Sequence, residues 1–317
     1  DLYPDRPLDE VPIGHIPNGV PLPTWTAPPA RDFLDTHLDG DFTERHEPDI
    51  WAGLEKVSDE DLWSYRSILR TRLINYIEGH VHTQSLPMQP DLDPEALTIG
   101  FARRFATYKR APLIFTDLER ARALFADEDR PIQLIYAGKA HPADDAGKRF
   151  IQRIYEISQM EGFEGKVVFL EGYNMEIGRM LVSGCDVWLN NPRRPLEASG
   201  TSGQKIAAHG GLNLSVLDGW WPEGYNGHNG WAIGPEPTGE LKVDRPDQDK
   251  RDREDALSLY HQLEENVIPT FYDRDEDDLP REWIDMMRDA MTGLPAPFSA
   301  KRMVLDYVEQ MYRNESA

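Results

Sequence analysis

The chain has 317 residues, of which 39% are hydrophobic and 28% charged, and its formal net charge is −22 at pH 7. So acidic a surface repels nucleic acid and anionic membranes, and we exclude both as expected partners. No apolar run is long enough to span a bilayer, and one cysteine provides neither a disulfide framework nor a cysteine-based metal site. The composition therefore predicts a soluble, cytoplasmic protein.

The first part of the chain differs from the rest in composition and in hydrophobic periodicity. Residues 1–50 are rich in proline, glycine and aspartate with little periodicity, which predicts extended, irregular chain. Apolar residues then recur at helical spacing over about 51–85, with a break near Ser58, and a turn-like linker follows at 89–94. We therefore treat residues 1–94 as an irregular and helical lead-in to a larger unit, residues 95–317.

In that unit, short apolar runs alternate with amphipathic segments of helical length. The runs are 97–101, 132–137, 167–170, 187–189 and 212–217; the helical segments are about 110–126, 146–160, 174–184, one beginning near 203, and then 253–266, 280–291 and 299–313. Apolar strands separated by helices predict an α/β fold, a Rossmann-like doubly wound parallel sheet covered on both faces, with extra helices at both ends. Such sheets bind ligands at the carboxyl ends of their strands.

A basic segment follows the first predicted strand. Arg103, Arg104, Lys109 and Arg110 place four cations within eight residues of a very acidic chain. They fit an anion-binding wall, because guanidinium forks and an ammonium suit phosphate oxygens. A solvated basic helix start is the alternative that this segment alone leaves open.

A second segment follows the fourth predicted strand and leads into a helix. Small residues at 198–203 let backbone N–H groups converge on one anion at the helix start. Lys205 comes one short helical turn later, where an amine suits a phosphorylated aldehyde held by the loop. An ordinary capped loop with a surface lysine is the alternative.

Other reactive residue types give weaker signals. Cys185 lies in an apolar run, which predicts a buried, unreactive thiol. His141, His209 and His228 lack metal-ligand spacing, so we interpret them as structural or solvent-facing and predict no metal site. No carboxylate pair forms a recognisable glycosidase motif.

Residues 197–205 are Glu-Ala-Ser-Gly-Thr-Ser-Gly-Gln-Lys. This sequence resembles the pyridoxal-phosphate signature of the α-glucan (glycogen/maltodextrin) phosphorylases, in the variant that is typical of their bacterial and archaeal branch. The resemblance runs from about residue 10 to 235. Corroborating matches follow in order: Asn18-Gly19-Val20 with Trp25, Arg103-Arg104, Tyr108-Lys109-Arg110, Gly138-Lys139-Ala140, Phe169-Leu170-Glu171 with Tyr173, and Leu217-Asp218-Gly219.

The resemblance implies roles for individual residues. Lys205 corresponds to the lysine in Schiff-base linkage to pyridoxal 5'-phosphate, and it is the first catalytic candidate together with Arg104 and Lys109. The residues implied to surround the cofactor are Gly200, Thr201, Ser202, Lys109, Arg103 and Tyr173. Arg104 is implied to bind the substrate phosphate, and the sugar contacts are implied to be Glu197, Ser199, Gly200, Tyr108 and Asn18.

The sequence departs from the animal enzymes at several of these positions. Arg103 replaces a lysine, so the charge is kept with a different reach. Ala106 stands where those enzymes have a histidine, and Ser202 and Gly203 replace Gly-Asn. The amide contacts to a phosphate survive the loop changes because they need no side chain.

The implied activity is retaining phosphorolysis of terminal α-1,4-linked glucose, with α-1,4-glucan and orthophosphate as substrates and glucose 1-phosphate as product. The family has two Rossmann-like domains in a GT-B arrangement, and only the C-terminal one fits here. We therefore expect a fragment that lacks its N-terminal partner domain and is inactive alone, with a homo-oligomer possible for the full-length protein. A nucleotide-sugar-dependent glucan synthase and a non-catalytic glucan-binding module remain alternatives.

Overall fold

The fold is built on one six-stranded sheet in which every strand pairing is parallel. The computed structural model describes residues 3, 6–7, 10–84, 90–235 and 247–312. The strands are β1 (Leu97–Ala102), β2 (Ile132–Ala137), β3 (Val167–Leu170), β4 (Val187–Asn190), β5 (Leu212–Val216) and β6 (Gly230–Ile233), in the order β3-β2-β1-β4-β5-β6. The predicted Rossmann-like α/β fold is confirmed.

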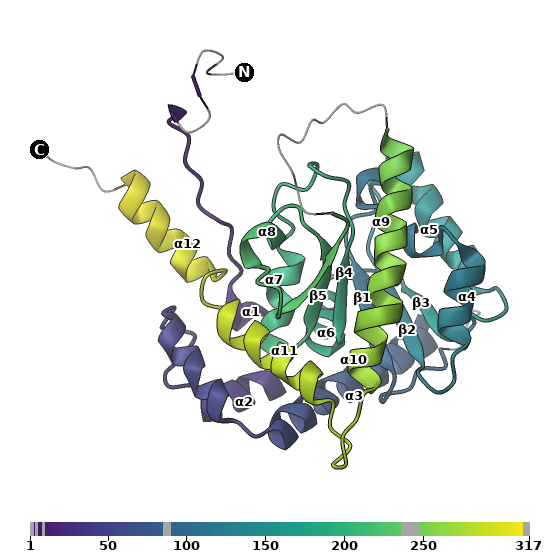
Figure 1. Ribbon diagram of the computed structural model, residues 1–317, viewed down its shortest axis with the longest axis horizontal. Coiled ribbons are helices and arrows are strands. Elements are labelled where there is room, and N and C mark those ends of the chain that lie inside the picture. Colours follow the sequence, from purple (N-terminus) through teal and green to yellow (C-terminus); the bar gives the residue numbers. More distant parts are fainter. Residues whose placement is uncertain (1–2, 4–5, 8–9, 85–89, 236–246, 313–317) are drawn as a thin grey trace, which may run out of the picture.

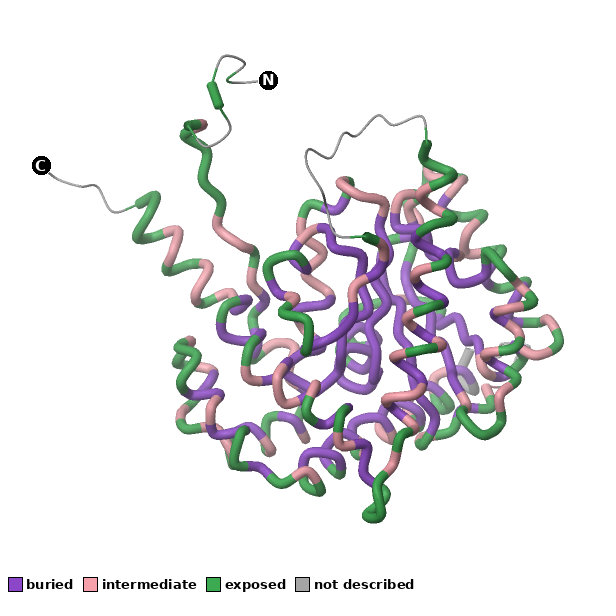
Figure 2. The backbone as a smooth tube through the Cα atoms, viewed as in Figure 1, coloured by how far each residue is buried: buried purple, intermediate pink, exposed green. Residues whose placement is uncertain are grey.

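Both faces of this sheet are buried, which explains why its strands are continuous apolar runs. Successive side chains of a strand point to opposite faces. In β2, Leu134 and Tyr136 belong to one hydrophobic cluster, whereas Ile135 and Ala137 belong to another on the opposite face. The centre of the molecule is accordingly buried from strand to strand (Figure 2).

Helices cover the two faces of the sheet and continue beyond it (Figure 1). Those between the strands are α4 (Leu118–Ala126), α5 (Asp145–Ser158), α6 (Met175–Gly184), α7 (Ser202–Ile206) and α8 (Trp221–Gly224), with short 3₁₀ turns at Thr107–Lys109, Leu113–Phe115 and Ala207–His209. After the sheet come α9 (Gln248–Gln262), α10 (Ile268–Tyr272), α11 (Arg281–Gly293) and α12 (Ala300–Tyr307), with π-helical turns at Leu263–Val267 and Val308–Tyr312. Among the described helices, none combines the length and apolar character needed to cross a membrane.

The structure corrects one local prediction, adds one strand, and confirms one helix over its described residues. The segment 110–126 is not one helix, because Asp117 caps a new helix there by accepting a hydrogen bond from Arg120 N. Strand β6 was not predicted, since its short Gly-Trp-Ala-Ile sequence carries a weak apolar signal. The helix predicted for 299–313 is α12 and its π turn, and residue 313 lies outside the described part of the chain.

The lead-in is more ordered than its composition predicts. Extended, irregular chain over residues 1–50 is wrong for α1 (Leu22–Trp25) and for α2 (Pro28–His37). In both helices proline occupies a first-turn position, where its missing N–H breaks no helical hydrogen bond. The helical prediction for 51–85 is confirmed as a 3₁₀ helix (Pro48–Lys56) followed, after the break at Ser58, by α3 (Asp59–Gln84).

Helix α3 is joined to the sheet by a buried ion triad. Arg66 Nε and Arg70 Nη1 lie 3.1 and 2.9 Å from Asp186 Oδ1, and all three side chains are inaccessible to solvent. The second carboxylate oxygen of Asp186 accepts a hydrogen bond from Thr98 N in β1 at 2.9 Å. The triad therefore fixes the lead-in to the base of β1 and β4.

The lead-in also pairs with the C-terminal part of the chain. Val20 and Ser299 form an isolated parallel β-bridge, with Val20 N donating to Phe298 O at 2.8 Å and Ala300 N donating to Val20 O at 2.9 Å. Gly19 admits this approach because a Cβ there would lie 2.2 Å from Ser299 O. Segments about 280 residues apart in sequence thus lie side by side, and Gln204 of α7 donates to Asn18 O next to them.

Candidate active site

The candidate site lies where the strand order of the sheet reverses. β1 and β4 are neighbours in the sheet, yet β2 and β3 lie on the other side of β1. Loops leaving the carboxyl ends of two such strands diverge and leave a crevice that binds ligands. Arg103 follows β1 directly, and Asn190 is the last residue of β4. The predicted basic segment and the predicted glycine-rich loop therefore meet at one edge.

Two cations of the basic segment converge on one carboxylate oxygen. Arg103 Nη2 and Lys109 Nζ lie 2.5 and 2.6 Å from Glu197 Oε2, and all three side chains are at least nine-tenths buried. Arg103 Nη1 also donates to Asn190 Oδ1. Burial opposes ionisation of Glu197, but the Arg103 and Lys109 charges hold its pKa below the usual range. A solvated basic helix start is thus wrong for Arg103 and Lys109.

Glu197 is held in place through its backbone, and one of its oxygens is available. Glu197 N donates to Asp218 Oδ2 at 3.0 Å. Burial raises the pKa of Asp218, and the nearby Glu197 charge raises it further, although two backbone N–H groups oppose the shift. Within the described residues, Glu197 Oε1 has no hydrogen-bond donor, so this oxygen is free to accept one from a ligand.

The predicted phosphate loop lies against the cations. Gly200 adopts φ 76°, a left-handed conformation that glycine takes without strain, and a Cβ there would be 3.4 Å from Arg103 Nη2. Trp220 N fixes the loop by donating to Ser199 O at 2.8 Å, and Trp188 Nε1 donates to Ser202 Oγ at 3.2 Å. Gly200 therefore lies beside the Arg103 guanidinium, in a loop whose flanks are fixed by Trp220 and Trp188.

Lys205 lies on α7, immediately after this loop. Its Nζ is 3.5 Å from the centroid of the Trp25 ring, and it makes no hydrogen bond or ion pair within the described residues. Burial lowers the pKa of Lys205 from its ordinary 10.5 to about 8. An amine with so low a pKa is still mostly protonated at physiological pH, but far more of it than of an ordinary lysine is in the neutral form that attacks a carbonyl carbon.

The backbone of Lys205 is fixed by a buried histidine. His209 Nδ1 donates to Lys205 O at 3.0 Å, while its Nε2 accepts from Ala27 N at 3.1 Å. One ring nitrogen donates and the other accepts, so the imidazole is neutral. Burial lowers the pKa of His209 to about 3. The prediction that His209 is structural is confirmed.

The remaining predicted site residues lie around this centre with different exposure. Arg104 is exposed and makes no hydrogen bond or ion pair in the described part of the chain. Tyr173 lies near Trp25, since a Cβ at Gly178 would be 3.1 Å from the Tyr173 hydroxyl and 3.6 Å from the Trp25 ring. Asn18 contributes its backbone carbonyl, which accepts from Gln204 Nε2 at 3.1 Å.

Of the other two predicted residues, Thr201 is the N-cap of α7, and no hydrogen bond from its side chain caps that helix. Tyr108 is half-buried, with Lys109 Nζ 4.8 Å from its ring centroid.

The structure adds three residues to the site. Asn190 holds Arg103, Asp218 holds the backbone of Glu197, and Trp25 contacts the Lys205 amine. A polar residue at the very end of a predicted parallel strand was the available signal for Asn190. Trp25 and Asp218 belong to quoted motifs, but no residue spacing places them beside Lys205 and Glu197. Cys185, as predicted, is buried, and burial raises the pKa of its thiol.

The sequence of this region is similar to that of known proteins. Residues 55–221, just over half of the chain, match the family model described as carbohydrate phosphorylase. The match includes α3 of the lead-in, the basic segment, the Glu197 loop and Lys205.

Named relatives are similar over nearly the whole chain. It is 45% identical to the maltodextrin phosphorylase of Thermococcus litoralis over 98% of its length, 42% identical to the glycogen phosphorylase of Aquifex aeolicus over 96%, and 45% identical to that of Mycobacterium bovis over 96%. The chain spans 37%, 44% and 36% of the lengths of these three proteins, respectively.

Proposed function

This chain belongs to the carbohydrate phosphorylase family, and we propose that it supplies the pyridoxal-phosphate-binding half of an α-1,4-glucan phosphorylase. The proposed reaction is retaining phosphorolysis of terminal α-1,4-linked glucose to α-glucose 1-phosphate. The observation that carries the proposal is the Lys205 amine, held against Trp25 with a pKa of about 8, one helical turn beyond a loop that faces Arg103.

The described residues fit pyridoxal 5'-phosphate by the chemistry of their donors. The cofactor needs an uncharged amine, an apolar surface for its ring and a cationic, N–H-rich pocket for its phosphate. Lys205 and Trp25 meet the first two needs. The loop at Gly200 and the cations Arg103 and Lys109 meet the third.

Within the proposed complex, residues of this chain bind and orient. Lys205 would hold the cofactor, while the amides of Gly200–Ser202 and the ammonium of Lys109 would hold its phosphate. Arg104, exposed and without an anionic partner in the described chain, would bind the substrate phosphate. Glu197 Oε1 would accept a sugar hydroxyl, since Oε2 is already taken by Arg103 and Lys109.

When bound, the cofactor would supply a phosphate group that exchanges a proton with the substrate phosphate beside it. Two phosphates in contact repel strongly unless cations surround them. Arg103, Arg104 and Lys109 would supply that positive charge, and burial of Arg103 and Lys109 would strengthen it by excluding water. The proposed substrates are α-1,4-glucan and orthophosphate.

Reductive trapping tests the cofactor assignment. The chain is incubated with pyridoxal 5'-phosphate, reduced with borohydride, digested and mapped by mass spectrometry. We expect one stoichiometric pyridoxyl adduct, on Lys205, and none after Lys205→Arg. Lys148→Arg, at an exposed position of α5, is the matched control and should leave the adduct unchanged.

An adduct spread over exposed lysines, or none at all, would contradict the proposal. That second outcome is what a glucan synthase using a nucleotide sugar, or a non-catalytic glucan-binding module, would give. Because the chain spans less than half of each of those three relatives, we expect it to bind cofactor without releasing glucose 1-phosphate on its own.

A further inference from the structure

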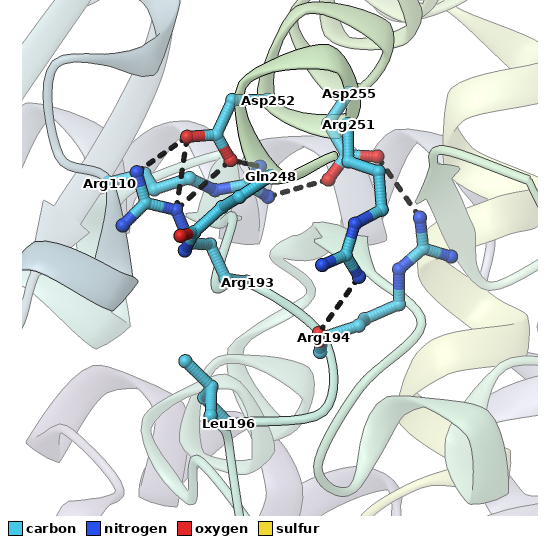
Figure 3. Close-up of a pocket in the computed structure, with 8 residues that line it drawn as sticks. All are labelled: Arg110, Arg193, Arg194, Leu196, Gln248, Arg251, Asp252 and Asp255. Carbon is cyan, nitrogen blue, oxygen red and sulfur yellow. Dashed lines mark hydrogen bonds and ion pairs between the residues drawn. The ribbon is translucent and has the colours of Figure 1, made fainter. Parts of the chain in front are cut away.

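A second cluster of charged residues lies between α9 and the loop that follows β4. Figure 3 shows Asp252 and Asp255 projecting from α9 toward arginines of the basic segment and of that loop. The lining residues of this pocket are Arg110, Arg193, Arg194, Leu196, Gln248, Arg251, Asp252 and Asp255. Four guanidinium groups face the two lining carboxylates and the neighbouring Asp247, which leaves an excess of one positive charge in a chain whose net charge is −22.

The two aspartates are fully engaged by three of the arginines. Asp252 accepts from Arg110 Nη1 at 2.9 Å and from Arg193 Nη2 at 2.5 Å. Asp255 accepts from Arg110 Nη2 at 2.8 Å and from Arg194 Nη2 at 3.0 Å. Both Nη atoms of Arg110 are therefore paired with carboxylates, and Arg110 links Asp252 to Asp255. The excess positive charge therefore resides on the other three arginines of the pocket.

Arg251 is the most weakly paired of the four arginines. Its Nη1 donates to Arg194 O at 3.5 Å, whereas its Nε is buried without a hydrogen-bond partner, and the nearest carboxylate, Asp247 on the same helix, is 3.6 Å away. Arg193 Nη1 and Arg194 Nε also have no acceptor within the described residues. Buried polar groups are nearly always paired, and charged donors above all, so the buried Nε of Arg251 calls for an acceptor, and an anion there would be within the reach of three arginines.

We propose that this pocket is an anion site for a single phosphate group, either orthophosphate or the phosphate of a sugar phosphate, bound by Arg193, Arg194 and Arg251. Guanidinium forks match the tetrahedral oxygens of phosphate. The proposal does not depend on the activity proposed above, because none of these three arginines contacts Lys205 or Glu197.

Occupancy of this site would stabilise the loop that carries Glu197. Arg193 N donates to Tyr108 O at 2.7 Å, next to Lys109, and Leu196 N donates to Arg193 O at 2.9 Å, next to Glu197. An anion on Arg193 and Arg194 would therefore anchor both segments that form the Lys109–Glu197 pair.

Calorimetric titration with orthophosphate, glucose 1-phosphate and sulfate at constant ionic strength tests the site. Arg251→Gln should weaken one class of anion binding by about tenfold or more, the usual loss for a charge-assisted hydrogen bond. Arg253→Gln is the matched control: it removes the same charge from an exposed position of α9 outside the pocket, and should bind as the unmodified chain does. Arg104→Ala should retain the class that depends on Arg251.

The relative affinities for the three anions distinguish free orthophosphate from a sugar phosphate as the ligand. Equal binding of orthophosphate and sulfate with weaker glucose 1-phosphate indicates a site for the free ion, whereas tighter glucose 1-phosphate indicates a sugar phosphate. If Arg251→Gln and Arg253→Gln titrate alike, or no anion binds the unmodified chain, the proposal is wrong and water fills the pocket. Circular dichroism melting without anion checks that both variants are folded.

Discussion

The acidity of the Lys205 ammonium is the most distinctive property of any single residue here. Its pKa of about 8 arises from burial alone. A lysine with a lowered pKa loses its proton as pH rises through that value, so the nucleophilic neutral amine accumulates above pH 8. We predict that reductive labelling of Lys205 by pyridoxal phosphate increases with a midpoint near pH 8, measured by peptide mapping at each pH.

The Trp25 ring provides the control for that prediction. Trp25→Ala lets water reach the amine, so the pKa of Lys205 should rise toward 10.5 and the labelling midpoint should move upward with it. Labelling of exposed Lys148 gives the pH response of the reagent itself. An unchanged midpoint in Trp25→Ala would show that the ring does not exclude water from the amine.

Arg104 is predicted to contribute to binding of the substrate phosphate and not to binding of the cofactor. Because it is exposed and not paired with a described carboxylate, Arg104→Ala should leave folding and cofactor content intact. Loss of a charge-assisted hydrogen bond costs about 1.5–3 kcal/mol, so orthophosphate should bind the cofactor-loaded chain at least tenfold more weakly. In the complete enzyme turnover should fall more than cofactor affinity. Loss of cofactor with normal turnover per bound cofactor would reverse the assignment.

At the residue scale, the sequence predicted which segments form the candidate site but not the contacts between them. Residues 197–205 carry a dense motif, and the rule that ligands lie at strand ends placed Arg103 and Lys109 near it. The pairing of both cations with one oxygen of Glu197 depends on tertiary packing across about 90 residues. No local pattern encodes it.

Among the elements, α3 depends most on a few polar atoms. Asp186→Asn would leave the guanidinium of Arg66 buried without a counter-charge, and that of Arg70 with only the exposed Glu95 carboxylate, 3.9 Å away. Breaking a buried ion pair from one side costs about 3–5 kcal/mol. We predict a loss of that size in the free energy of unfolding, measured by urea denaturation.

Asp32→Asn, at an exposed position of α2, removes the same charge and should change stability by less than about 0.5 kcal/mol. A similarly small loss in Asp186→Asn would mean that α3 is held by its apolar contacts alone.

The elements themselves were largely predictable, for a physical reason. Strands buried on both faces are continuous apolar runs, and β2 and β3 match their predicted bounds. Helix α2 was not predicted, because the prolines that start it also mark irregular chain. β6 was missed because its short, glycine-led sequence gives too weak an apolar signal to identify a strand.

Over the whole molecule, repulsion among negative charges opposes folding. A net charge of −22 is spread over a compact chain, whereas unfolding separates the charges. Raising NaCl from about 0.01 to about 0.15 M shortens the screening length from about 30 to about 8 Å. We therefore predict that the free energy of unfolding increases over this range, measured by urea denaturation. A decrease would show that ion pairs outweigh the repulsion.

The bridge between Val20 and Ser299 has a consequence for synthesis. Val20 leaves the ribosome long before Ser299 is translated. The lead-in therefore cannot form this bridge until the sheet and the helices that follow it have been synthesised. Until then its apolar residues, Leu22 and Trp25 among them, have no finished surface on which to dock. Contacts between residues so far apart close slowly, and an unfinished chain exposes surfaces that aggregate. A nascent chain of this protein is therefore most in need of a chaperone until Ser299 has been translated.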